Sequence, residues 1–215
     1  MGTGWDGVPR VEDMATKSSS TQTFTVPGLS AQESSTVVSA LQDRLFAYTD
    51  LHLVLKHVHW NVVGPNFIGV HEMLDPQVDV VRGYADAVAE RIATMGGTPI
   101  GTPGALVDAR SWDDYDIGKD TAQAHLGALD LVYTGVIEDN RSAIDVVGEV
   151  DPVTEDLLIG QTGELEQFHW FIRAHLENAG GRLATEGATT EEEAADAARG
   201  SRRTTRKATK AARKK

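Results

Sequence analysis

The chain has 215 residues, a formal net charge of -12 at pH 7, 40% hydrophobic residues and no cysteine. A chain of this length can form one domain with tails, and the lack of cysteine excludes disulfides and thiolate metal sites. Because no window is apolar enough to cross a bilayer and the N-terminus lacks a signal-peptide pattern, we expect a cytoplasmic protein with no membrane partner.

The first half of the chain predicts two long helices separated by a sharp break. Residues 30–33 match a capping box, and hydrophobic residues at spacings of three and four follow it, so we expect a helix over about 31–62. Gly64-Pro65 ends this helix because proline has no amide proton to donate to the helical ladder. The second helix begins near 66 and ends at Gly96-Gly97, a typical C-terminal cap.

The second half predicts a long connection and two further helices. A segment rich in Gly and Asp over 97–119 contains a short helical turn, and a third helix follows over about 120–147. Asp151-Pro152 has the order favoured at a helix start, and Gly180-Gly181 would close the fourth helix. Four helices, one long connection and no strand pattern predict an all-α four-helix bundle with a short helix between helices 2 and 3.

Composition divides the chain into a flexible N-terminal tail (1–29), the bundle (30–183) and a disordered C-terminal tail (184–215), because the last segment is too poor in apolar residues to form a core. After Asp196 every charged residue is basic: Arg199, Arg202, Arg203, Arg206, Lys207, Lys210, Arg213, Lys214 and Lys215. The rest of the chain holds 11 of the 20 basic residues against all 32 acidic ones. An acidic body with a basic tail indicates two kinds of partner.

Four potential metal ligands share one face of the second predicted helix: His71, Asp75, Asp86 and Glu90. Steps of four, eleven and four residues keep them in a narrow stripe, at about 100° per residue. The two pairs are nevertheless separated by eleven residues, or roughly 16 Å along the helix, whereas a bond from a metal to a His nitrogen or a carboxylate oxygen is about 2 Å long. One ion cannot contact both pairs of a single helix.

A second copy of this helix, antiparallel and related by a twofold axis, removes that difficulty. The axis would place His71 and Asp75 of one copy opposite Glu90 and Asp86 of the other and create two identical sites. His59 lies near the same place because the turn after the first helix is short. Nitrogen and oxygen ligands without sulfur suit iron or manganese, with zinc as a competitor, and a redox role favours iron.

Other interpretations of these residues fit their spacing less well. The stretch His71–Asp75 resembles the zinc-protease H-E-x-x-H motif but ends in Asp. Only Glu166–His169 matches the Glu-x-x-His motif, of which a di-iron site inside one bundle requires two. Trp60 is either a packing residue or a nearby electron donor.

The stretches KHVHWNVVGPNFIGVHEMLD and YADAVAERIATMGG resemble the Dps family, the DNA-binding proteins of starved cells, which are ferritin-like mini-ferritins. The resemblance is specific from Lys56 to Gly97 and looser over Thr25 to Arg182. It implies that five residues form a two-iron ferroxidase site between twofold-related subunits: His59, His71 and Asp75 of one chain, with Asp86 and Glu90 of the other.

The resemblance further implies a hollow dodecamer of twelve subunits with roles in iron homeostasis and oxidative stress. Such a shell binds Fe(II), oxidises it with hydrogen peroxide in preference to oxygen, and stores the ferric mineral. Because a basic tail attracts phosphate without reading sequence, we expect non-specific binding to double-stranded DNA and association with the nucleoid. Two alternatives remain open: a structural nucleoid protein whose site is idle or holds zinc, and a mini-ferritin without DNA contact.

Overall fold

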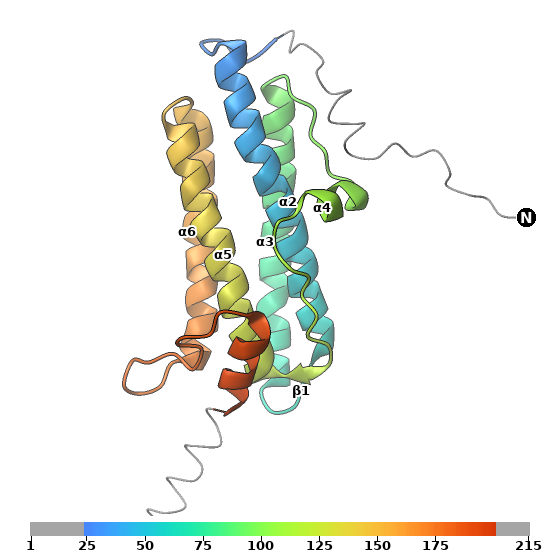
Figure 1. The fold of residues 1–215 in the computed structure, drawn as a ribbon, viewed down its shortest axis with the longest axis vertical. Helices are drawn as coiled ribbons and strands as arrows, with labels where there is room; N and C mark the ends of the chain where they lie inside the picture. The colour runs from blue at the N-terminus through green and yellow to red at the C-terminus, as the bar shows by residue number, and fades with distance from the viewer. Residues whose placement is uncertain (1–23, 201–215) are drawn as a thin grey trace, which may run out of the picture.

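The computed structural model describes residues 24–200, which contain four long helices: α2 (Ala31–Asn61), α3 (Phe67–Thr94), α5 (Ala122–Gly148) and α6 (Pro152–Leu176). α2 packs against α3 and α5 packs against α6, and the two pairs together form a bundle (Figure 1). The short α4 (Pro103–Ala109) lies in the connection between α3 and α5. The predicted all-α four-helix bundle is confirmed. In the described part of the chain, no helix combines the length and the hydropathy needed to span a membrane.

Side-chain caps and a proline set two of the helix starts, as the sequence predicted. The Ser30 hydroxyl accepts a hydrogen bond from the Glu33 amide (3.3 Å), and the Glu33 carboxylate accepts one from the Ser30 amide (2.8 Å). At the start of α6, the Asp151 carboxylate accepts a hydrogen bond from the Val153 amide, and Pro152 occupies the first helical position. Such caps satisfy amide groups that have no partner inside the helix.

The turn between α2 and α3 brings the ends of these two helices together. Gly64 (φ 85°) and Asn66 (φ 72°) adopt the left-handed conformation, which glycine and asparagine tolerate best. The Phe67 amide donates to the Gly64 carbonyl oxygen (3.0 Å). Next to the turn, β1 (Val62–Val63) pairs in parallel with β2 (Asp120–Thr121). The sequence shows no strand pattern at these positions, and the short pairing forms because the long connection returns past the turn, where its backbone pairs with β1.

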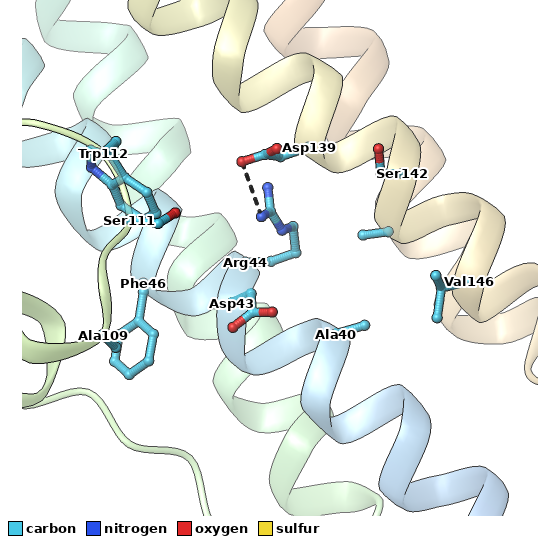
Figure 2. Close-up of a pocket in the computed structure, with 11 residues that line it drawn as sticks. Ala40, Asp43, Arg44, Phe46, Ala109, Ser111, Trp112, Asp139, Ser142 and Val146 are labelled. Atoms are coloured by element: carbon cyan, nitrogen blue, oxygen red, sulfur yellow. Dashed lines mark ion pairs between the residues drawn. The ribbon is translucent and has the colours of Figure 1, made fainter.

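A buried polar network joins the two helix pairs. Arg44 of α2 is only 6% exposed, and its guanidinium donates to the side-chain oxygen of Asn140 on α5 (3.2 Å). The Asn140 amide donates in turn to the hydroxyls of Tyr48 (2.8 Å) and Thr162 (3.2 Å). The Asp139 carboxylate faces the same guanidinium at 3.5 Å (Figure 2). These contacts fix how α2 sits against α5 and α6, since a buried polar group without a partner is costly.

The fourth helix ends earlier than predicted. α6 stops at Leu176 rather than at Gly180-Gly181, because Glu177 is extended and forms an antiparallel bridge with Leu183. The two glycines lie instead in the turn that joins these bridge partners, where Gly181 has a φ of 79°.

The chain beyond this turn is folded, and residues 191–200 form a helix at the β1 end of the bundle (Figure 1). The prediction of a disordered tail from residue 184 onward is therefore wrong for 184–200. The rest of that predicted tail, 201–215, lies outside the described residues, as do residues 1–23 of the predicted N-terminal tail.

Small side chains explain how this C-terminal helix packs without large hydrophobic residues. Ala194, Ala195 and Ala198 are at most 1% exposed. They lie against α5 at Gly127, where an added Cβ would stand 2.4 Å from the Ala194 carbonyl oxygen. Alanine and glycine carry little side-chain surface, so a composition-based analysis undervalues a contact that depends on close backbone approach.

A buried carboxylate on α5 anchors the same segment. Asp130 is 4% exposed, and its Oδ2 accepts a hydrogen bond from the Thr185 hydroxyl (2.6 Å). Its Oδ1 contacts the His169 Nε2 (2.7 Å) and the Arg173 Nε (2.9 Å) on α6. Burial by itself would raise the pKa of Asp130, but the hydrogen bonds from His169, Thr185 and Arg173 outweigh it and lower the pKa to about 2.

This network predicts that Asp130→Asn destabilises the protein. A carboxylate with a depressed pKa stabilises the fold above its ordinary pKa of 3.8, and that contribution is lost as the pH falls through about 2. We expect Asp130→Asn to cost about 2 kcal/mol at pH 7 and to remove the corresponding acid dependence. Urea denaturation at pH 7 and at acid pH, at one protein concentration, measures both effects.

The exposed Asp145 on α5 provides the matched control, and Asp145→Asn should change the unfolding midpoint little. An Asp130→Asn protein as stable at pH 7 as the Asp145→Asn protein would show that the Asp130 network contributes nothing to stability.

Candidate metal centre

Two of the predicted ligands are locked together across the α2–α3 turn. The rings of His59, in the last turn of α2, and His71, in the second turn of α3, stack with centroids 3.6 Å apart and an interplanar angle of 21°. Each Nδ1 lies 2.9 Å from the backbone carbonyl oxygen of the other histidine. A carbonyl oxygen only accepts hydrogen bonds, so each Nδ1 carries a proton, and Nε2 is the ring nitrogen left to bind a metal.

Asp75 lies one helical turn beyond His71 and joins this pair. Its Oδ1 is 3.2 Å from the His59 Nδ1 and 2.6 Å from the ammonium of Lys56 on α2. The hydrogen bond from Lys56 is the main cause that holds the pKa of Asp75 below its ordinary value, against a smaller opposing effect of burial. The carboxyl group is therefore ionised at neutral pH, and half of the side chain is exposed.

Asp86 and Glu90 lie farther along α3 and do not join the other three ligands. Both are exposed, and their side chains make no hydrogen bond or ion pair with any residue in the range 24–200. Across the same range, no group of three or more His, Asp or Glu side chains is arranged to hold a metal ion. One chain thus brings His59, His71 and Asp75 together and leaves the two remaining carboxylates on the surface. Their pairing with a second copy stays a prediction.

An apolar surface without a partner in the described chain surrounds the half-site. Leu53, Trp60, Phe67 and Ile68 come from the same ends of α2 and α3 and are 52%, 69%, 38% and 56% exposed. Leu53 and Trp60 also line a hollow of about 410 Å³ together with Asp75. Exposed apolar side chains that cluster in this way are typical of a surface that binds another protein.

The sequence analysis missed Lys56 as a member of this site. Lys56 and His59 are three residues apart on α2 and therefore lie on one face of that helix. That spacing was a usable signal, but the contact with Asp75 depends on how α2 and α3 pack, which the sequence alone does not reveal.

Of the nine basic tail residues, only Arg199 lies within the described range 24–200. Its guanidinium forms an ion pair with Asp120 at 2.8 Å and another with Asp196. Arg199 therefore helps to hold the C-terminal helix and is not a free charge for another partner. The remaining eight predicted tail residues, from Arg202 to Lys215, lie outside the described part of the chain.

The bundle and its surface of histidines and carboxylates define a ferritin-like protein, and the model of the ferritin-like domain matches residues 38–180. The chain is 65% identical over 176 residues to the DNA protection during starvation protein of Mycolicibacterium smegmatis; the match covers 82% of this chain and 96% of the relative. The chain belongs to the Dps family, as the sequence resemblance predicted.

Solved structures agree with this assignment. Mycobacterium smegmatis Dps superimposes with a TM-score of 0.77 at 65% identity, covering 78% of this chain and 95% of that chain. DpsA14 from Streptomyces coelicolor gives a TM-score of 0.74 at 63% identity, covering 75% of this chain and 96% of that chain.

Proposed function

We propose that this protein oxidises Fe(II) at sites shared by two twofold-related chains and stores the ferric product inside a hollow dodecamer. The observation that carries the proposal is the divided ligand set. His59, His71 and Asp75 form one half of a site, while the exposed Asp86 and Glu90 lie eleven and fifteen residues beyond Asp75 on the same helix. Only a second chain can bring the two halves within bonding distance, because eleven helical residues span roughly 16 Å.

Iron is the substrate of this reaction, and the ligands fit it. The two Nε2 atoms and the carboxylates of Asp75, Asp86 and Glu90 supply two neutral and three anionic ligands, which suit two Fe(II) ions with positions left for the oxidant. Each Fe(II) gives one electron to the same hydrogen peroxide molecule, whose O–O bond breaks to yield water after two protons are taken up. Oxygen is the alternative electron acceptor. Paired transfer avoids release of a hydroxyl radical.

A metal ion that binds Asp75 would compete with Lys56. The Lys56 ammonium lies 2.6 Å from the Asp75 Oδ1, so a metal ion held by this carboxylate would have to share or displace that contact. The lysine keeps that carboxyl ionised and oriented toward the histidine pair, so that a ligand is in place when Fe(II) arrives.

We also propose that the basic C-terminal residues bind double-stranded DNA without reading its sequence. The support is the relative named for DNA protection during starvation, together with the charge pattern of this chain. Residues 201–215 contain eight Lys or Arg and no acidic residue, which favours phosphate contacts. The protein would then act in iron homeostasis and oxidative stress close to the nucleoid.

A pair of complementary variants tests the shared site. Chains carrying His71→Ala/Asp75→Ala and chains carrying Asp86→Ala/Glu90→Ala should each fail to oxidise Fe(II). In a mixed dimer, one of the two sites combines two damaged halves and the other combines two intact halves. Random co-assembly of the variants should therefore restore about one quarter of the wild-type sites. Ferric absorbance after anaerobic addition of Fe(II) and hydrogen peroxide measures the recovery.

As a control, gel filtration must show that each variant assembles to the wild-type size. No recovery in the mixture would rule out a site between chains. Wild-type protein that gives no more ferric absorbance than a protein-free solution would instead favour an idle or zinc-occupied site in a structural nucleoid protein.

Truncation after Gly200 tests the DNA proposal. Because eight positive charges are removed while the C-terminal helix is kept, we expect loss of duplex retention in a gel with an unchanged rate of Fe(II) oxidation. Retention equal to that of the full chain would contradict the tail as the DNA-binding element. Loss of both functions would point to failed assembly, which gel filtration detects.

A further inference from the structure

A concave surface that shares no lining residue with the hollow at the metal half-site lies between α2, α5 and the chain segments that flank them. Its larger hollow, about 690 Å³, is lined by residues of α2 and α5, by 112–116 of the long connection and by 189–192 before and within the C-terminal helix. A second hollow of about 390 Å³, seen in Figure 2, shares Trp112 and Asp139 with the first. We call the larger hollow the acidic groove.

The acidic groove carries a dense negative charge. Within the described residues, no Lys or Arg lines it. Seven carboxylates do: Asp50, Asp113, Asp114, Asp116, Asp139, Glu191 and Glu192. Arg110 partly compensates Asp114 (2.8 Å) and Asp50 (3.6 Å) from outside the groove. Four of the seven carboxylates have no hydrogen bond or ion pair within residues 24–200: Asp113, Asp116, Glu191 and Glu192.

The raised pKa of Glu191 shows that little of this negative charge is balanced by nearby cations. Burial is the main cause that raises its pKa to about 7, and the charges of Asp116, Asp50, Asp113 and Asp114 add to the shift. A carboxyl group that keeps its proton near neutral pH indicates a surface on which a positive group would be favoured.

The floor of the acidic groove is apolar. Leu51 and Val54 of α2 and Val132 and Val136 of α5 contribute apolar side chains to its lining. A ligand with cationic side chains around small apolar ones therefore matches both the rim and the floor.

We infer that residues 202–215 of this same chain bind in the acidic groove and thereby compete with DNA for the basic tail. The segment contains eight cations and no anion, which complements the rim. Its apolar side chains, Ala208, Ala211 and Ala212, are small enough to pack against the apolar lining of the groove.

The position of the chain end makes this return possible. Glu192 lies in the groove and Gly200 is eight residues farther along the same helix, or about 12 Å away. The fifteen residues that follow reach about 50 Å when extended, so their cations can turn back to the groove of their own chain. The ion pairs of Arg199 with Asp120 and Asp196 hold the point of departure close to the bundle.

The inference concerns the tail of the proposed DNA-binding function, but binding to the groove can be measured without DNA. The chain has no cysteine, so Ala208→Cys provides a single position for a nitroxide spin label on the full-length protein. At low salt we expect a broad electron paramagnetic resonance spectrum from a restricted label. Adding Asp113→Asn/Asp116→Asn/Glu192→Gln should sharpen it.

A matched control removes three exposed charges outside the groove: Asp108→Asn/Asp145→Asn/Asp156→Asn. This variant should keep the broad spectrum. A sharp spectrum in the protein with an intact groove, or equal sharpening in both triple variants, would overturn the inference.

Duplex binding gives a second readout on the unlabelled proteins. The groove variant should bind DNA roughly 3- to 10-fold more tightly than the wild type, and the control variant should gain clearly less, because only the first one frees the tail. Equal gains would overturn the competition. If no protein retained the duplex, the proposed DNA function would fail, and the spin-label spectra would still decide whether the tail occupies the groove.

Discussion

The geometry of one helix sets the constraint on which the proposed chemistry depends. α3 continues without a break from Phe67 to Thr94, and its potential ligands fall into two pairs that roughly 16 Å of helix keeps apart. No side-chain rotation can close such a distance. A chain that carries these residues on one rod can use them together only by meeting another chain, so the proposed catalytic site and the proposed assembly depend on the same constraint.

The turn before α3 orients two of the proposed metal ligands, His59 and His71, before any metal binds. Left-handed Asn66 and Gly64 reverse the chain within a few residues, and the reciprocal contacts of His59 and His71 then fix both rings. Ligands that are already oriented lose little freedom when a metal ion binds, which is the general advantage of preorganisation. The exposed Trp60 and Ile68 beside them give a partner chain an apolar surface to cover.

The sequence was a good guide wherever a local rule decides the outcome. Caps and breaks at Ser30, Gly64 and Asp151 marked the helices, and the helical period placed the candidate ligands on one face. It failed where tertiary packing decides. The contact of Lys56 with Asp75 requires two helices to lie side by side. The helix over 191–200 is stabilised by close approach to a glycine of α5, which apolar composition does not reveal.

The C-terminal helix also places the start of the basic tail beside the acidic body of the chain. Taken from composition alone, the basic tail and the acidic body are separate regions with separate partners. In the fold, Thr185 is tied to Asp130 and Arg199 to Asp120, so the tail begins at a fixed point close to a groove lined by carboxylates. Interactions between exposed charges are largely screened beyond a Debye length, which is about 8 Å at physiological salt, so the proposed binding of the tail in the groove would weaken as salt is added. Under the proposed competition, the affinity of the tail for phosphate would be a difference between two attractions, and DNA would have to overcome the attraction of the groove.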